Sequence, residues 1–395
     1  MLNERMLACG KKSSVIREIF EYGKKRKNEI GWDKVFDFSL GNPSVPCPQC
    51  VSDELTRLIR ELPPEILHGY TSAPGDINVR QSIADYINRT HGVKESADNI
   101  FLTVGAAASL TITLNALVNE GDNVIVFAPF FPEYRVFAEK AGAELRVVEC
   151  TRGDFQPDLD KLERAIDKKT KAVIINSPNN PTGVIISDKT VKRLCQVLKD
   201  KSSQLGTEIF LISDEPYREL VYTESKPIFI TSCYANSIVC YSFSKSLSLP
   251  GERIGYILVG SECRDVRDVY YAICGSARCL GYVCAPALFQ YLIPSVLGKT
   301  SDIEVYRKNK DILYSALTEY GYECASPDGA FYLFVKALED DAISFCERAK
   351  KYELLLVPSN DFGIDGYVRI SYCVSREQIL ASLDSFKKLY EEYKK

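Results

Sequence analysis

The segment Tyr241-Ser-Phe-Ser-Lys-Ser-Leu-Ser-Leu-Pro-Gly-Glu-Arg-Ile-Gly255 organises the rest of the 395-residue chain. Its lysine, Lys245, follows the apolar run 237–241, which is typical of a buried strand. The polar residues around it are Ser242, Ser244, Ser246, Ser248 and Arg253. A lysine amine can form an imine with an aldehyde, while hydroxyls and a guanidinium can hold a phosphate. A surface lysine in a serine-rich loop would give the same pattern, so this segment alone leaves both interpretations open.

Length and composition limit the class of protein. A chain of 395 residues suits two domains, and its net charge of -4 provides no basic field for nucleic acid. No apolar run is long enough to span a membrane, and residues 1–10 lack the apolar core of a signal peptide. We therefore expect a cytoplasmic protein with no nucleic-acid partner and no membrane segment.

Cysteine and histidine usage bears on the chemistry. The 14 cysteines are scattered, mostly in apolar runs, where a free cysteine acts as a small hydrophobe. Only Cys47-Pro-Gln-Cys50 has the spacing of metal ligands. The sequence has no second pair of this kind that could complete a metal site, so none is predicted. With only two histidines, His68 and His91, proton transfer must fall on lysine, tyrosine or carboxylates.

Seven apolar runs, most of them uninterrupted, predict strands, most of which are expected to be buried on both faces. Helical patterns such as 106–119 and 188–198 lie between them. The predicted strands are 99–104, 123–127, 144–148, 172–175, 209–213, 238–241 and 255–259. This alternation predicts an α/β large domain, with a mainly parallel seven-stranded sheet between two helical layers. Ligands of such sheets bind beyond the carboxyl ends of the strands.

The last part of the chain has a different pattern, typical of a smaller α+β domain. Long helices are predicted at 302–320, 340–352 and 376–393, and short strands at 330–335 and 367–371. The last helix is expected to pack through Ile379, Leu380, Leu383, Phe386 and Leu389. We therefore predict a large domain at 49–285 and a small domain at 286–395. Residues 1–48 are expected to pack with the small domain and the active site.

Groups that could bind a ligand follow two of the predicted strands, but each could also have a purely structural role. Gly105-Ala-Ala follows the first predicted strand and opens a helix, which suits a phosphate or merely close packing. Phe131 follows the second strand between two prolines, and its ring could cover a flat ligand or belong to the core.

Two further strand ends are polar. The turn Asn176-Ser-Pro-Asn-Asn-Pro-Thr-Gly183 provides amides, and Asp214-Glu-Pro-Tyr217 places a carboxylate where a buried charge needs a partner. A protonated ring nitrogen would be such a partner. The chain has no glycine-rich loop for dinucleotides or ATP. A phosphate seat, a ring cover, a carboxylate for a ring nitrogen and an amine for an aldehyde together indicate pyridoxal 5′-phosphate.

These motifs give the chain a resemblance to a known family. The set Asn180-Pro-Thr-Gly183, Asp214-Glu-Pro-Tyr217 and Ser242-Phe-Ser-Lys245 with Arg253 resembles the class I/II aminotransferases, the aspartate-aminotransferase-like branch of fold-type I pyridoxal-phosphate enzymes. The similarity extends from Leu40-Gly-Asn-Pro43 to Val368-Arg-Ile370. It implies a ping-pong transfer of an amino group from an L-amino acid to a 2-oxo acid.

The resemblance assigns a role to each matching residue. Lys245 would form the Schiff base and move the proton, Asp214 would keep the ring nitrogen protonated, and Tyr217 would bond the ring hydroxyl with Asn180. The remaining residues for the cofactor are Gly105, Ala106, Ala107, Ser242, Ser244 and Arg253 for the phosphate, Phe131 for the ring, and Tyr70, given to the neighbouring subunit. This sharing implies a homodimer.

For the substrate, the resemblance implies that Arg369 clamps the α-carboxylate, with Gly41 and Asn180 nearby. Some relatives carry a lysine that meets a second carboxylate, and Ala107 stands at that position here. Arg278 could replace it or be a surface or interface charge. The expectation is a broad or neutral side-chain specificity.

Two alternatives remain open at this point. A C–S β-lyase of the same fold would use the same Lys245 and Asp214, and would release pyruvate and ammonia without an oxo-acid acceptor. A non-catalytic pyridoxal-phosphate-binding regulator would often carry an added DNA-binding domain, for which the sequence leaves no segment.

Overall fold

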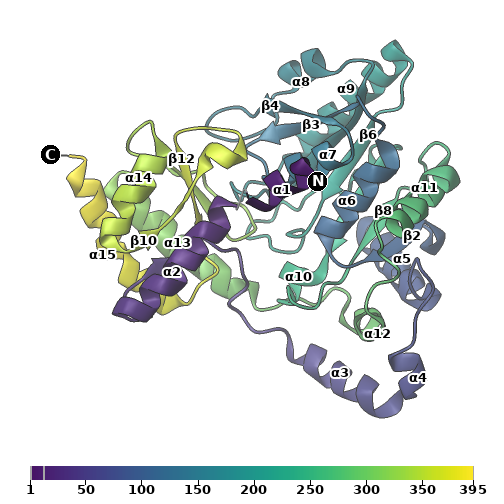
Figure 1. Cartoon of the computed structure of the whole chain (residues 1–395), viewed down its shortest axis with the longest axis horizontal. Helices are drawn as coiled ribbons and strands as arrows, with labels where there is room; N and C mark the ends of the chain where they lie inside the picture. The colour runs from purple at the N-terminus through teal and green to yellow at the C-terminus, as the bar shows by residue number, and fades with distance from the viewer. Residues whose placement is uncertain (1, 12–13, 395) are drawn as a thin grey trace.

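The computed structural model describes residues 2–11 and 14–394, and its centre is a seven-stranded sheet. The strand order is β2-β8-β7-β6-β5-β3-β4, and only β8 runs antiparallel to its neighbours. The strands are β2 (Ile100–Thr103), β3 (Asn123–Ala128), β4 (Glu144–Glu149), β5 (Thr170–Asn176), β6 (Phe210–Asp214), β7 (Ser237–Ser242) and β8 (Gly255–Val259). Each of the seven predicted strands is present, and the predicted α/β fold class is confirmed (Figure 1).

The two faces of the sheet are both apolar because successive residues of each strand point to opposite sides. In β6, Leu211 belongs to one hydrophobic cluster, and its neighbours Phe210 and Ile212 belong to the other. The first face is covered by α5 (Ile77–His91), α8 (Leu159–Ala165), α9 (Asp188–Leu205) and α12 (Ala287–Val296), and α3 (Gln49–Glu61) packs on the outside of α12. The second is covered by α6 (Ala106–Leu117), α7 (Glu133–Lys140) and α11 (Val266–Cys279). The large part of the chain is therefore three-layered.

The register of the strands gathers the polar strand ends. Asn176 at the end of β5 pairs with Asp214 at the end of β6, and Asp214 pairs with Cys240 of β7. Two residues after Cys240, β7 ends at Ser242, and the short helix α10 (Phe243–Ser246) begins directly. The carboxyl ends of three neighbouring strands thus meet at one edge of the sheet.

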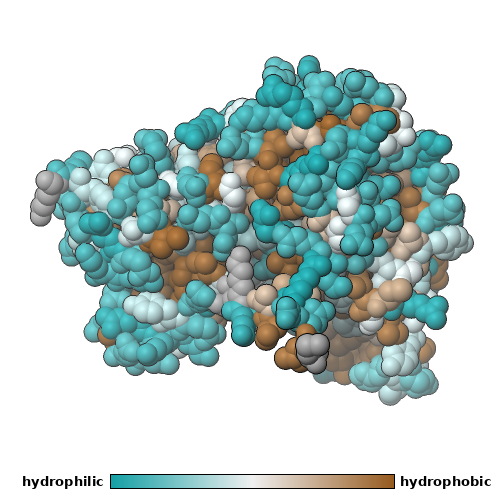
Figure 2. Space-filling model, turned by 45° about the horizontal axis from the view of Figure 1, so that its top comes forward, coloured by the Kyte–Doolittle hydropathy of each residue, from teal (hydrophilic) through white to brown (hydrophobic). Residues whose placement is uncertain are grey.

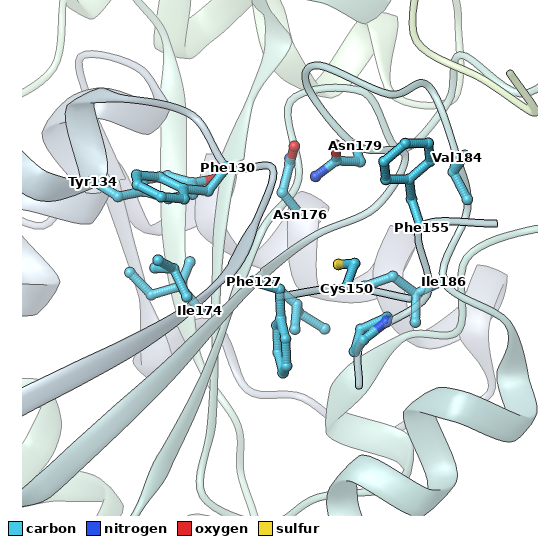
Figure 3. Close-up of a pocket in the computed structure, with 13 residues that line it drawn as sticks. Phe127, Phe130, Tyr134, Cys150, Phe155, Ile174, Asn176, Asn179, Val184 and Ile186 are labelled. Atoms are coloured by element: carbon cyan, nitrogen blue, oxygen red, sulfur yellow. The ribbon is translucent and has the colours of Figure 1, made fainter. Parts of the chain in front are cut away.

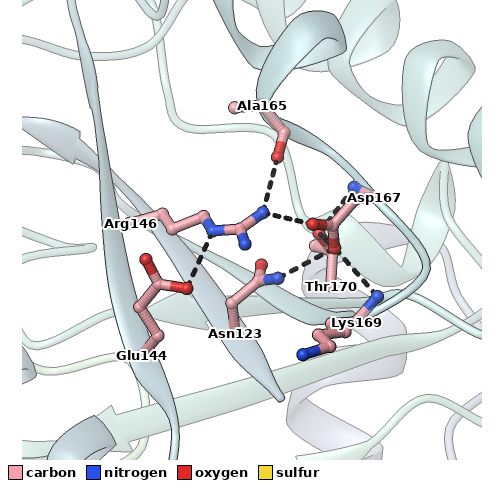
Figure 4. A network of polar contacts seen from close by, with 7 residues as sticks. All are labelled: Asn123, Glu144, Arg146, Ala165, Asp167, Lys169 and Thr170. Atoms are coloured by element: carbon pink, nitrogen blue, oxygen red, sulfur yellow. Dashed lines mark hydrogen bonds and ion pairs between the residues drawn. The ribbon is translucent and has the colours of Figure 1, made fainter. Parts of the chain in front are cut away.

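An ion-pair network lies at the amino ends of β3, β4 and β5, opposite the polar strand ends. Arg146 of β4 contacts Asp167 at 2.7 Å and Glu144 at 3.2 Å, and Asn123 donates to Asp167 at 3.0 Å (Figure 4). Burial acts to raise the pKa of Asp167, but Arg146, the backbone N–H of Lys169 and Asn123 outweigh it and lower the pKa to about 2. The network ties β3, β4 and the turn before β5 together, far from the polar strand ends.

The smaller part of the chain is an α+β unit. An antiparallel sheet of β9 (Tyr332–Lys336), β11 (Val357–Pro358) and β12 (Tyr367–Ser371) packs with α13 (Ile303–Tyr320), α14 (Ala342–Ala349) and α15 (Arg376–Glu392). On α15, Ile379, Phe386 and Leu389 are buried as predicted, but Leu380 is 49% exposed. That part of the prediction is wrong, because Leu380 lies about 100° around the helix from Ile379, outside the stripe that faces the core.

Most of the N-terminal segment lies against this small unit, but its first helix, α1 (Glu4–Lys11), lies over the large part of the chain beside α7, where Arg5 donates to the Glu139 carbonyl (Figure 1). The segment also contains α2 (Val15–Ile30) and β1 (Phe36–Asp37), which pairs in parallel with β10 (Leu354–Leu355). Ile19 and Val35 share a hydrophobic cluster with Phe334 of β9. On the packing of α2 and β1, we propose that residues 1–48 belong with the small domain.

The division between the two domains remains a proposal. Leu292, Ile293 and Val296 of α12 belong to the hydrophobic cluster under the seven-stranded sheet. This packing favours a boundary after residue 296 over one at 285. The large domain also contains the short helix α4 (Pro64–Leu67).

The surface and the helices carry two further observations. Figure 2 shows apolar side chains gathered between the two parts of the molecule, while the outer faces of the helices are hydrophilic. Among the described helices, none has the length and apolar character needed to cross a bilayer.

The sheet core generates a stability prediction. Leu211 is fully buried in β6, so Leu211→Ala should lower the free energy of unfolding by about 2–5 kcal/mol through lost burial and a cavity. Val147→Ala on edge strand β4, where the side chain is 39% exposed, should change it by no more than about 0.5 kcal/mol. Urea unfolding of the two variants at one protein concentration measures the difference. Equal losses would contradict the assignment of Leu211 to the central core.

Candidate active site

A cavity of about 510 Å³ opens at the carboxyl ends of the strands. Its walls come from the seven-stranded sheet, the small domain and the N-terminal segment. The lining residues predicted from sequence are Gly41, Ala106, Ala107, Phe131, Asn180, Asp214, Tyr217, Ser242, Ser244, Lys245, Arg253 and Arg369. The structure therefore brings residues from distant parts of the chain into one space.

Lys245 lies in α10 at the end of β7, with its amine in this cavity. Its Nζ donates to the Gly41 carbonyl oxygen at 2.6 Å and lies 5.6 Å from the centre of the Phe331 ring. Burial, with the positive charges of Arg253 and Arg369, lowers the pKa of Lys245 to about 8, although Cys373 acts to raise it. Roughly a tenth of the amine is therefore uncharged at pH 7, far more than for an ordinary lysine, as a nucleophilic or basic role needs.

Asp214 ends β6 and is 4% exposed. One carboxylate oxygen accepts a hydrogen bond from the Tyr134 hydroxyl at 2.5 Å, while the other, Oδ1, is buried without a partner. Burial raises its pKa to about 7, with Glu215 adding to the rise and Tyr134 opposing it. A buried carboxylate with an orphaned oxygen suits a cationic ligand group.

A small second cavity lies beside the groups that hold Asp214. It has a volume of about 20 Å³, room for about one water, and both Tyr134 and Asn176 line it (Figure 3). The Asn176 amide also donates to the backbone carbonyl of Asp214 at 2.8 Å. Tyr134 thus fixes the carboxylate of Asp214, and Asn176 fixes its backbone.

The candidate phosphate seat forms around Gly105, between β2 and α6. Gly105 has a φ of +95°, and a methyl group there would lie 2.6 Å from the Arg253 guanidinium, so only glycine fits. Arg253 donates to the Ser244 hydroxyl at 3.3 Å, and the Ser242 hydroxyl donates to Ser244 at 2.8 Å. Backbone N–H groups at the start of α6, two hydroxyls and a guanidinium together make an anion site.

Arg369 of β12 is buried, with 2% of its surface exposed. Its guanidinium donates to Asn180 Oδ1 at 3.1 Å and to the Ser39 carbonyl at 2.5 Å, and it lies 4.6 Å from the centre of the Tyr332 ring. Its Nε has no partner, and burial lowers its pKa. An unsatisfied cation beside the cavity suits a carboxylate ligand.

The aromatic side chains complete the walls. The Tyr217 and Tyr332 hydroxyls share a hydrogen bond at 2.8 Å, and burial raises the pKa of Tyr217 well above its usual value. Phe131 packs edge-on against Tyr134, with ring centres 5.6 Å apart. A methyl group on Gly41 would overlap the Tyr332 hydroxyl, so this approach of the N-terminal segment needs glycine.

Two residues predicted for the site lie outside this cavity in the single chain. Tyr70 is 91% exposed, and Arg278 is exposed at the end of α11. Neither lines the cavity. An exposed tyrosine is compatible with its donation to a neighbouring subunit, which remains a prediction.

Sequence reasoning missed three groups that matter in the site. Tyr134 holds Asp214, Tyr332 stacks on Arg369, and the exposed Arg17 of α2 lines the cavity. Tyr134 lies three residues after Phe131 at the start of a helix, which was the one available signal. Nothing local in the sequence marks Tyr332 or Arg17, because their neighbours in space are remote along the chain.

The cavity fits pyridoxal 5′-phosphate on its own geometry. The orphaned oxygen of Asp214 can take a pyridinium N–H, the seat at Gly105 and Arg253 can take a phosphate, and Lys245 can reach an aldehyde. For metals, the described part of the chain contains no group of three or more histidine, cysteine, aspartate or glutamate side chains that could hold an ion.

The chain is similar to known proteins over most of its length. The family model for aminotransferase class I and II matches residues 33–386. The aspartate aminotransferase of Thermotoga maritima is 32% identical over 89% of this chain and 90% of its own length. A solved structure of an aminotransferase from Eubacterium rectale superposes with a TM-score of 0.98, at 52% identity over all of both chains.

A second solved structure gives the same result. The aspartate aminotransferase structure from Thermotoga maritima has a TM-score of 0.87 at 30% identity, covering 98% of this chain and 99% of that one. With the family model matched over most of the sequence, the chain belongs to the class I and II aminotransferases, which are pyridoxal-phosphate-dependent enzymes.

Proposed function

We propose that this aminotransferase binds pyridoxal 5′-phosphate covalently through Lys245 and moves an amino group between an L-amino acid and a 2-oxo acid by a ping-pong mechanism. The observation that carries this proposal is the placement of two groups in one cavity. Asp214 presents a buried oxygen without a partner, and Lys245 presents an amine with a lowered pKa.

The residues that would hold the cofactor divide by the part they contact. Ser242, Ser244, Arg253 and the start of α6 would hold the phosphate, while Asp214 would pair with the ring nitrogen. Phe131 would cover the ring, and Asn180 and Tyr217 would bond its hydroxyl. When bound, the cofactor supplies an electron-withdrawing ring that stabilises the negative charge left when a substrate loses its α-proton.

The chain's own groups then orient the substrate and move the proton. Arg369 binds the α-carboxylate with its two-pronged guanidinium, which fixes the α-carbon relative to Lys245. Once it is released from the cofactor, Lys245 Nζ would take the α-proton from the substrate. It would then give this proton to the former aldehyde carbon of the cofactor. Asp214, held by Tyr134, would lose its proton once a cationic ring nitrogen lay beside it, and its charge would then keep that nitrogen protonated.

We also propose that the enzyme works as a homodimer with shared sites. The support is Tyr70, a large aromatic side chain that is 91% exposed in the single chain. A tyrosine that completes the phosphate seat of a neighbouring subunit would become buried on assembly.

A C–S β-lyase would need the same Lys245 and Asp214. The relatives described above carry aminotransferase names, which supports transamination as the main reaction. Mixing the enzyme with cysteine or cystathionine and no oxo acid distinguishes the two, since only a lyase releases pyruvate and ammonia over many turnovers.

Reduction with borohydride tests the central proposal. It should fix the cofactor to the peptide that contains Lys245, as detected by mass spectrometry. Lys245→Ala should lose the label and nearly all transamination, while Lys308→Ala, at a 59% exposed side chain, should keep both. Label on another lysine, or none in the wild type, would refute the covalent role of Lys245.

The lowered pKa of Lys245 gives a pH prediction for the apoenzyme. Only the neutral amine reacts with an acetylating reagent, so the labelling rate of Lys245 should rise with pH to half its maximum at about pH 8. An ordinary lysine would reach that point near pH 10.4. In Arg369→Gln the midpoint should move upward, because a nearby positive charge is removed. A midpoint near 10 in the wild type would contradict the effect of burial.

Arg369→Lys tests the carboxylate clamp. The lysine keeps the charge but loses the two-pronged geometry, so kcat/KM should fall by roughly 10- to 100-fold for every amino acid. The absorbance of bound cofactor should be unchanged. Arg376→Lys, at an exposed position on α15, is the matched control and should behave as the wild type. Unchanged kinetics in Arg369→Lys would remove this residue from the site.

Side-chain specificity can be tested against the charges around the cavity. Ala107 lines it without a charge, Arg278 lies outside it, and Arg17 and Glu133 line it without an ion pair within the described ranges. We expect kcat/KM for aspartate to exceed that for alanine, leucine and phenylalanine by less than about a hundredfold. A preference for aspartate above a hundredfold that survives Arg278→Ala would contradict this expectation. If that preference disappeared in Arg17→Ala, Arg17 would be identified as the cation that binds the second carboxylate.

A further inference from the structure

We propose that Cys195 and Cys233 form an oxidation-sensitive thiol pair, in which Cys233 reacts with a peroxide and Cys195 then closes a disulfide. This site is separate from the cavity of Lys245, because neither cysteine lines that cavity. The inference therefore does not depend on the proposed function.

The geometry of the pair is the first argument. Cys195 lies on α9 and is 2% exposed, and Cys233 follows the short 3-10 helix η2 (Ile230–Ser232) and is half-buried. Their sulfur atoms are 3.4 Å apart. In the described part of the chain no other two cysteine sulfurs make such a contact, although all fourteen cysteines are free.

The charges around the pair make the two sulfurs unequal. Lys192 and Lys199 lie three residues before and four residues after Cys195, on the same face of α9. The hydrogen bond from Cys195 lowers the pKa of Cys233, and Lys199 and Lys192 add to this effect, while burial and Asp188 oppose it. The same contact, with burial, raises the pKa of Cys195 far above its usual value.

This difference separates the pair from the other buried cysteines. Burial raises the pKa of Cys150, Cys240, Cys346 and Cys373 to about 12 or above, so these thiols stay protonated and inert. Cys233 combines partial exposure, a lowered pKa and an adjacent second thiol. Those three properties together are typical of redox-sensitive cysteines.

Cys233 is the member of the pair that an oxidant would meet first, because its side chain is partly exposed while Cys195 is 2% exposed. An open hollow of about 440 Å³ is lined by Lys199, Ser202 and Tyr234, which are close neighbours of the two cysteines along the chain. Neither cysteine lines this hollow, so the access of hydrogen peroxide rests on the exposed part of Cys233, whose thiolate form Lys199 favours.

The chemistry balances with hydrogen peroxide as the named oxidant. The Cys233 thiolate attacks one peroxide oxygen, the O–O bond breaks, and hydroxide leaves, which gives a sulfenic acid. Oxidation of Cys233 removes the thiolate whose hydrogen bond and negative charge had raised the pKa of Cys195. Cys195 then loses its proton and attacks the Cys233 sulfur, so the S–O bond breaks and water forms. Two thiols are oxidised to one disulfide, and one peroxide is reduced to two waters.

The position of the bond has a mechanical consequence. The loop that it would close, residues 195–233, contains β6 and therefore Asp214. Cross-linking restricts the unfolded chain across this segment, so the oxidised enzyme should melt about 2–6 °C higher than the reduced one. Activity should be retained because no residue of the substrate cavity is altered.

The test uses the holoenzyme, treated with hydrogen peroxide and then alkylated in acid to trap the remaining thiols. Non-reducing peptide mass spectrometry should show the Cys195–Cys233 cross-link, lost again on adding dithiothreitol. Chymotryptic cleavage after Tyr234 separates Cys233 from Cys240, so the assignment is unambiguous. In Cys195→Ser, Cys233 should instead accumulate as a dimedone-labelled sulfenic acid.

Two controls make the result decisive. Cys346→Ser, at a buried thiol of α14, should still form the cross-link, and Lys192→Gln with Lys199→Gln should slow iodoacetamide labelling of Cys233 at pH 7 by severalfold. The proposal is overturned if another pair forms first, if no cross-link appears under peroxide, or if Cys233 reacts no faster than the other thiols.

Discussion

The arrangement of the groups at the carboxyl ends of the strands depends on the buried carboxylate of Asp214, which has one oxygen without a hydrogen-bond partner. Leaving such an atom without a partner costs about 1–3 kcal/mol, and more when the group is charged. The fold nevertheless holds Asp214 in place with Tyr134 from α7 and Asn176 from β5. The sheet register places Asn176 and Asp214 side by side, and α7 brings Tyr134 to them, so stability is given up locally to keep the Asp214 carboxylate in one position.

The N-terminal segment is joined to this edge by the same kind of contact. Gly41 accepts the hydrogen bond of Lys245, and Ser39 accepts one from Arg369. Both acceptors are backbone carbonyls, so they depend on the path of the chain after β1 and little on side-chain identity. Gly41, which precedes Lys245 by 204 positions, therefore helps to hold the Lys245 amine in place.

The sequence predicted the sheet and most of the site for definite physical reasons. Strands buried on both faces must be continuously apolar, so β5 and β6 could be predicted from their apolar runs. The residues just after these strands were functional candidates because ligands of such sheets bind at the carboxyl ends of the strands. Tyr332 and Arg17 could not be found this way, because their roles arise from contacts between domains. Leu380 was predicted to be buried for a different reason, because the apolar face of the last helix was assumed to be wider than the part that contacts the core. Arg278 was placed near the substrate only by resemblance, and in the single chain it is exposed outside the cavity.

Arg369 connects three parts of the chain, since it extends from β12 to the large domain at Asn180 and to the N-terminal segment at Ser39. Its Nε is still unsatisfied, and its charge has no carboxylate partner among the described residues. A simple amine, or a decarboxylated amino acid, would fill the cavity while leaving this buried charge uncompensated. In the carboxylate-binding role proposed for Arg369, the guanidinium would also select for acids, because a ligand without a carboxylate would meet an electrostatic penalty whatever the fit of its side chain.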